Sequence, residues 1–115
     1  MRRISPECNA VLAPIGDALY VIGGKWKLRV IASLREGGMR FNKIQQSVEG
    51  ISARVLSAEL KELELNGFVK RIVHAASNPV VVEYQLTEYA GTLNEVLMAL
   101  SSWGTMHREK LKKER

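Results

Sequence analysis

Two stretches of the sequence carry residues whose types and spacing could do chemistry. The first is VIGGKWKL, residues 21–28, in which two glycines precede a lysine. A glycine-rich turn that leads through a lysine into a helix can cradle phosphate groups. A P-loop needs G-x-x-x-x-G-K followed by Ser or Thr, whereas here Leu19 stands at the first glycine position and Trp26 follows Lys25. We therefore interpret the glycines as a reversal between two helices and Trp26 as an apolar anchor of the core.

The second stretch, residues 52–65, has side chains that can read DNA. Arg54 can donate a bidentate pair of hydrogen bonds to guanine, Ala53 can contact a thymine methyl, and Ser57 can bond a base or a phosphate. The start of a helix is also the part that approaches base edges in the major groove. The predicted base-reading residues are Ser52, Ala53, Arg54 and Ser57. The less favoured interpretation is an amphipathic surface helix whose charges only keep it solvated.

Further polar and basic residues could contact the phosphate backbone, because cations and amides bind phosphate oxygens. The predicted set is Lys25, Lys27, Arg40, Asn42, Lys43, Lys61, Lys70, Arg71, Ser77 and Asn78. For Lys25 and Lys27, an ordinary solvated position stays open as the alternative. A predicted wing over residues 70–86 has no arginine at its tip, so we expect it to contact the backbone rather than to read the minor groove.

The distribution of charge favours a polyanionic partner. The chain has 17 Lys and Arg against 12 Asp and Glu, a net charge of +5. Residues 25–74 hold ten basic side chains against five glutamates, and the last eight residues are basic as well. Such a surface attracts nucleic acid, although a basic face that is merely solvated stays open as the alternative.

Composition and residue counts exclude several classes of protein. The 115 residues, 46% of them apolar, suit one small globular domain over residues 1–115. No apolar run approaches the ~20 residues of a membrane span, and no secretory signal is recognised, so we expect a cytoplasmic protein that does not contact membrane. Cys8 is the only cysteine, and His74 and His107 are far apart, so we expect no catalysis, no cofactor and no metal site.

Hydrophobic periodicity predicts the elements that position these residues, in the order α-α-α-α-β-β-α. The first helix opens with Pro14 in its first turn and ends at Gly23, and a second begins near Lys25. A third spans residues 41–48 and a fourth, capped by Ser52, spans residues 52–65. FVKRIVH and VVVEYQL, separated by AASNP, predict a hairpin, with a short strand near residue 39. Thr87 then caps a last helix that precedes a charged tail.

Two helices joined by a glycine-bearing turn and followed by a hairpin predict a winged helix-turn-helix. The fold class is α+β and mainly helical, with additional N- and C-terminal helices. The apolar stripe of the last helix exceeds what so small a core must cover, so we assign part of it to a second copy of the chain. The predicted dimer interface is Val11, Leu12, Ile15, Leu93, Val96, Leu97, Leu100 and Trp103.

The sequence also resembles the HxlR-type family of bacterial winged helix-turn-helix transcription regulators, in the MarR-like superfamily. The resemblance lies in GGKWKL, in RFNKIQQSVEGISARVLSAELKELELNGFVKR, in VEYQLTEYAGTL and in the late WG, and it covers roughly residues 10–104. It implies a homodimer, joined through the N- and C-terminal helices, that binds an inverted-repeat operator in double-stranded DNA. It also implies that a small-molecule or oxidant effector is possible. The competing interpretation is a winged-helix module that binds protein without specific DNA binding.

One departure from the family concerns the cysteine. In much of the family a Cys-Pro pair opens the first helix, whereas here Ala13 precedes Pro14 and Cys8 lies five positions earlier. Two roles stay open for Cys8: a redox sensor, or a small buried residue at the dimer interface. We favour the second, because free cysteine is among the most buried residue types.

Overall fold

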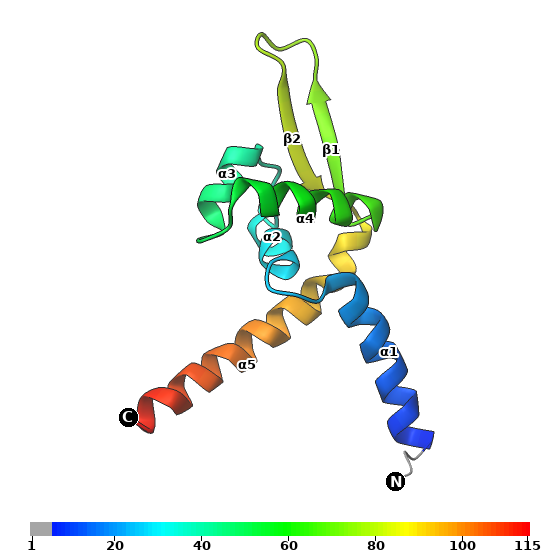
Figure 1. Cartoon of the computed structure of the whole chain (residues 1–115), viewed down its shortest axis with the longest axis vertical. Helices are drawn as coiled ribbons and strands as arrows, with labels where there is room; N and C mark the ends of the chain where they lie inside the picture. The colour runs from blue at the N-terminus through cyan, green and yellow to red at the C-terminus, as the bar shows by residue number, and fades with distance from the viewer. Residues whose placement is uncertain (1–5) are drawn as a thin grey trace.

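The computed structural model describes the backbone of residues 6–115 and the side chains of residues 10–115. Its elements follow the predicted order, with one additional 3-10 helix, η1, before the last helix. They are α1 (Pro6–Ile22), α2 (Lys27–Ser33), α3 (Phe41–Ser47), α4 (Ala53–Leu65), β1 (Val69–His74), β2 (Val81–Leu86), η1 (Tyr89–Leu93) and α5 (Asn94–Lys113). Figure 1 shows α2, α3, α4 and the hairpin grouped together, which we call the head, while α1 and α5 leave it in different directions as two arms.

The core of the head is formed by the apolar faces of α2, α3 and α4. Its fully buried side chains include Val30 and Ile31 from α2, Ile44 from α3, and Leu56 and Leu63 from α4. These residues recur at helical spacing, so each short helix buries one face and leaves the other to solvent. Because each fully buried aliphatic side chain contributes about 1.5–3 kcal/mol, the packing fixes α4 against α2 and α3.

The hairpin is an antiparallel pair that is anchored to the head at its base. Its register runs from Val69 opposite Leu86 to His74 opposite Val81. The predicted short strand near residue 39 is confirmed as an isolated bridge, in which the amides of Met39 and Tyr84 each donate to the other's carbonyl, at 2.9 and 2.8 Å. Gly38 allows this approach, since a Cβ there would collide with the side chains of β2.

The prediction that Pro14 opens the first helix is wrong. The helix α1 begins at Pro6, and Pro14 lies inside it. A proline is favoured in the first turn because its missing N–H has no partner there, and Pro6 meets that condition instead. Residues 10–13 are Ala-Val-Leu-Ala, which favour a helix. The helix therefore continues through Pro14, although proline has no backbone N–H to donate to a helical hydrogen bond.

Two further boundaries differ from the prediction. The helix α2 begins at Lys27 rather than Lys25. Thr87 precedes η1 rather than the last helix, and its hydroxyl oxygen accepts the amide hydrogen of Ala90 at 3.2 Å. The charged segment at the C-terminus is not a separate tail, because α5 continues through it to Lys113. Ion pairs between Glu109 and Lys112 and between Lys110 and Glu114 support the last turns, where basic side chains also suit the helix dipole.

Candidate nucleic-acid interface

The N-terminal end of α4 faces solvent and is held in place from behind. Ser52, Ala53, Arg54 and Ser57 are all exposed, whereas Leu56, Leu60 and Leu63 are buried on the opposite face. The predicted cap is confirmed, since the hydroxyl oxygen of Ser52 accepts the amide hydrogen of Val55 at 3.1 Å. The four residues predicted to read bases therefore lie together at the outward end of a fixed helix.

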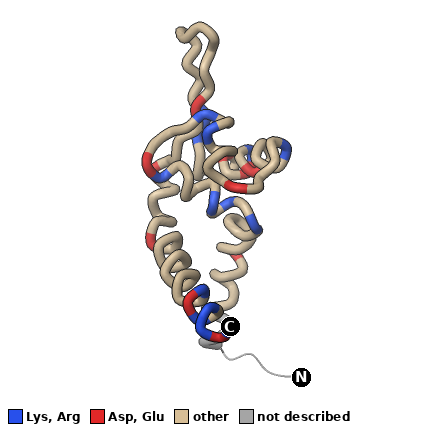
Figure 2. The backbone as a smooth tube through the Cα atoms, turned by 90° about the vertical axis from the view of Figure 1, so that its left-hand side faces the viewer, with Lys and Arg blue, Asp and Glu red and all other residues tan. Residues whose placement is uncertain are grey.

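Basic side chains surround this helix. Figure 2 shows Lys and Arg concentrated on the head and at the C-terminal end of α5, while most of the hairpin carries neither. At the start of α3, Arg40, Asn42 and Lys43 are exposed, and on α4 Lys61 is exposed one turn beyond Ser57. Such a surface can contact phosphates on either side of a groove.

The hairpin places its predicted contacts at two levels. Lys70 and Arg71 lie exposed near the base of β1, opposite Gln85 and Tyr84. Ser77 and Asn78 lie in the exposed turn at the tip, between β1 and β2. The cations are therefore nearer to α4 than the tip is, which suits a wing that contacts backbone beside the groove.

The two lysines beside Trp26 have different environments. Lys25 is exposed, with its Nζ 4.7 Å from the centre of the Trp26 ring, so it stays available to phosphate. Lys27 does not. Its Nζ lies 2.9 Å from Glu59 and 2.6 Å from Glu62, both on α4, and its side chain is only 13% exposed.

Lys27 therefore cross-links α2 and α4, and its two ion pairs leave it less available to phosphate than the sequence-based prediction assumed. The hydrogen bond to Glu62 raises the pKa of Lys27 above its ordinary value of 10.5, an effect that burial opposes and Glu59 reinforces. The Oε2 atom of Glu59 is buried without an aligned hydrogen bond, so the charge of Lys27 is its main compensation among the described residues. Because Glu59 and Glu62 lie on a different helix from Lys27, the sequence carried no local signal of this pairing.

We predict that Lys27→Met lowers the free energy of unfolding by about 1–3 kcal/mol at pH 7, because Glu59 loses its counter-charge. A raised lysine pKa stabilises the fold fully below the unfolded value of 10.5, and that contribution is lost as pH rises through the folded value. The gap between wild type and variant should therefore shrink above about pH 10.5. Urea titrations at pH 7 and pH 11 measure it, with the exposed Lys43→Met as control. Equal stabilities of the two variants at pH 7 would contradict the cross-link.

Six of the eight residues predicted for a dimer interface are exposed on the arms. Val11, Leu12 and Ile15 lie on α1, and Val96, Leu100 and Trp103 on α5. Leu93 and Leu97 differ, since they are partly buried and pack against the core of the same chain. Other exposed apolar residues of the arms were not included in the predicted interface, namely Leu19, Tyr20, Met98, Met106 and Leu111.

The remaining predicted residues are placed as follows. Cys8 falls within α1, but its side chain lies outside the described residues. His74 lies on β1, with its Nε2 3.9 Å from a carboxylate oxygen of Glu83, and His107 stacks on Trp103 with 5.1 Å between ring centres. Across the described side chains, no three His, Cys, Asp or Glu residues gather as a metal site would need. No helix within residues 6–115 combines the length and apolarity needed to cross a bilayer.

Three helices packed around one core, followed by a two-stranded wing, define a winged helix-turn-helix protein. A profile of the HxlR-like helix-turn-helix family matches residues 21–112. The chain belongs to the HxlR-like helix-turn-helix family of transcriptional regulators, as the resemblance in its sequence predicted.

Similar proteins support this assignment. The HTH-type transcriptional regulator BH0655 of Halalkalibacterium halodurans is 42% identical over 96 residues, which cover 83% of this chain and 84% of that protein. YdeP of Bacillus subtilis is 36% identical over 100 residues, covering 87% and 77%. Among solved structures, the redox regulator HypR in its reduced form has a TM-score of 0.79 at 37% identity, covering 87% of this chain and 98% of that one. YtcD has a TM-score of 0.77 at 36% identity, covering 83% and 96%.

Proposed function

We propose that this regulator acts in the cytoplasm as a homodimer that binds an inverted-repeat operator in double-stranded DNA. The observation that carries the proposal is the end of α4, where Ser52, Arg54 and Ser57 are exposed on a capped helix that Lys27 ties to α2. A fixed helix positions a guanidinium precisely enough to distinguish bases, which a mobile one does not. The exposed end of α4 would enter the major groove.

The surrounding cations would hold the protein in register on the duplex. The residues proposed to contact the DNA phosphate backbone are those predicted from the sequence, without Lys27. They are Lys25, Arg40, Asn42, Lys43, Lys61, Lys70, Arg71, Ser77 and Asn78. Contacts of this kind supply affinity without sequence information, and each neutralised phosphate makes binding more sensitive to salt.

The arms would join two copies of the chain, so that the α4 helix of the second copy contacts the other half of the operator. The exposed apolar residues of α1 and α5 form faces that the head does not cover in the described structure. Two copies joined through these faces by a two-fold axis would place their α4 helices one DNA turn apart, about 34–36 Å. The half-sites should then be inverted repeats with centres about 10 bp apart, or a multiple of that.

Selection of binding sites from random double-stranded DNA tests this function. We expect enrichment of one inverted-repeat sequence, because two identical reading helices related by a two-fold axis recognise the same half-site in opposite directions. Enrichment of a single unrepeated half-site would contradict the dimeric arrangement. Recovery of no sequence at all would favour the alternative, a winged-helix module that binds protein.

For Cys8 we predict no oxidant response. HypR is a redox regulator, but the cysteine of this chain does not stand at the Cys-Pro position of the first helix that the resemblance leads one to expect. Operator affinity of the wild type should stay the same after treatment with diamide or a quinone, and Cys8→Ser should bind equally well. Gel shifts and non-reducing gels on one preparation measure both properties. Release of DNA by oxidised wild type, but not by oxidised Cys8→Ser, would assign Cys8 as a sensor.

A further inference from the structure

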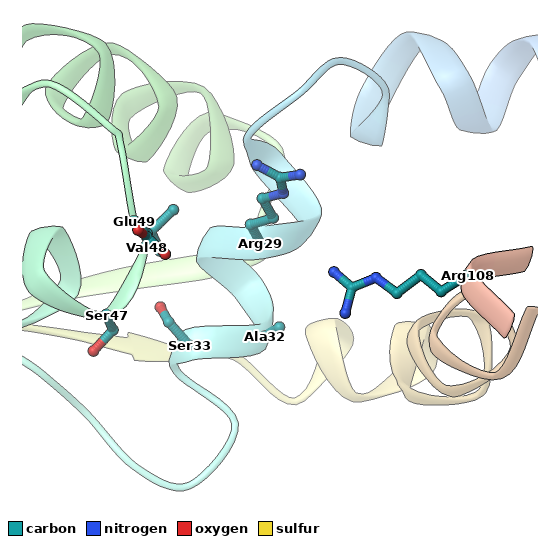
Figure 3. A pocket seen from close by; sticks show the side chains of 7 residues that line it. All are labelled: Arg29, Ala32, Ser33, Ser47, Val48, Glu49 and Arg108. Carbon is teal, nitrogen blue, oxygen red and sulfur yellow. The ribbon is translucent and has the colours of Figure 1, made fainter. Parts of the chain in front are cut away.

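An open cleft of about 600 Å³ lies between the head and α5. Arg29 and Ser33 line it from α2, Ser47 and Glu49 from α3 and the turn after it, and Arg108 from α5. Figure 3 shows the side chain of Arg108 extending from α5 toward α2, which carries Arg29. Segments far apart in the sequence therefore contribute two arginines to the lining of one cleft.

These two guanidinium groups are not neutralised within the described side chains. Neither Arg29 nor Arg108 has an ion pair or a side-chain hydrogen bond there, and Arg29 only approaches the ring of Trp26, at 5.6 Å. Glu49 lines the cavity as its single carboxylate, without an ion pair of its own in that part of the chain. The cavity thus carries an excess positive charge, and arginine forks bind carboxylate or phosphate groups in a bidentate manner.

The other polar residues that line the cleft offer acceptors rather than donors. The hydroxyl of Ser33 already donates to the carbonyl of Val30 at 2.6 Å, and that of Ser47 donates to the carbonyl of Lys43 at 2.9 Å. Their oxygens keep only acceptor capacity, and the carboxylate of Glu49 accepts as well. A ligand that matches both sets of residues has an anionic group for the arginines and a hydroxyl or amino group for these acceptors.

We propose that this cleft binds a small organic anion, a carboxylate or phosphate ester that also carries a hydroxyl or amino group. Its volume lies within the roughly 300–1,000 Å³ of small-molecule sites. The residues that line the cleft come from different parts of the protein, since α2 and α3 support the reading helix and α5, which contributes Arg108, carries the exposed apolar face. A ligand bridging them biases the angle between head and arm. This regulatory consequence rests on the proposed function, whereas the binding site does not.

Binding is tested without DNA, by calorimetry on the full chain at constant ionic strength. The probes are malate and aspartate against succinate, which lacks their hydroxyl or amino group, and glycerol phosphate against inorganic phosphate. We expect saturable binding of one substituted anion per chain, tighter than its unsubstituted counterpart. Arg29→Gln and Arg108→Gln should each weaken it at least about tenfold. Arg115→Gln, outside the cleft, should not.

Any one of three results would contradict the proposed site. The first is no saturation by any probe up to about 20 mM. The others are a loss of anion affinity in Arg115→Gln equal to that in the cleft variants, and unchanged anion affinity in both cleft variants. Because both cleft arginines are exposed, circular dichroism should show all the variants folded.

The regulatory link is tested with the selected operator. The bound anion should change operator affinity in the wild type and not in Arg108→Gln, and DNA should change anion affinity by the same factor. Saturable anion binding with unchanged operator affinity would refute the link. A protein that binds the anion but no DNA would refute the proposed function and leave the site standing.

Discussion

Replacing both Leu100 and Trp103 with glutamate should convert the proposed dimer to monomers and weaken operator binding by about 100-fold or more. Both residues lie on α5, and their exposed fractions are 50% and 59%. Neither contributes to the core of the head, so the reading helix keeps its fold and its chemistry. Affinity falls because each monomer binds only one half-site, and the second half-site no longer adds to the affinity of the first.

Sedimentation velocity measures the oligomeric state, and gel shifts on the same preparation measure operator affinity. Leu65→Glu serves as the control for oligomeric state, because Leu65 is exposed at the end of α4 and belongs to neither arm. Leu97 is not used, since it packs partly against the chain's own core and its replacement would also destabilise the monomer. A doubly substituted protein that stays dimeric would show that this face of α5 is not the interface.

The second large effect is expected at Arg54. Arg54→Ala should lose about 1–3 kcal/mol at the operator and relax the preference for one base pair in each half-site, without loss of stability. The side chain is exposed and has no partner among the described residues that would be left unpaired in the variant. Binding-site selection with the variant protein measures the relaxed position directly.

Lys61→Ala is the matched comparison on the same helix. Lys61 lies one turn beyond Ser57, and its replacement should weaken binding to all sequences alike. The salt dependence should become shallower by about 1 for each phosphate that the variant no longer neutralises. If Arg54→Ala instead gave this uniform pattern, Arg54 would contact backbone, and base reading would lie with other residues of α4.

The reading helix and the wing could be predicted because their signals are local. The Ser52 cap and the apolar stripe of α4 lie within one helix, and the change from helical to alternating periodicity identifies the hairpin. The pairing of Met39 with the hairpin is longer in range, and the sequence predicted only a short strand near residue 39 without its partner.

Tertiary contacts explain most of what the sequence did not show. Lys27 looks like any exposed basic residue until folding brings it beside Glu59 and Glu62, which lie on a different helix. Likewise, no sequence spacing relates Arg29 to Arg108.

The stripe on α5 shows a different limit. Periodicity identifies an apolar face but does not tell a residue covered by its own core, such as Leu97, from one left exposed, such as Leu100. Only the packing of α5 against the head separates the two groups.

The most direct test of sequence-specific DNA binding is the affinity of the wild type for its selected operator and for a scrambled duplex, measured by fluorescence anisotropy across a range of salt concentrations. We predict that the operator is bound at least about 10³-fold more tightly than the scrambled duplex at physiological salt. The logarithm of both affinities should fall linearly with the logarithm of salt concentration. Equal affinity for the two duplexes, or an affinity that does not change with salt, would contradict the conclusion that α4 reads DNA.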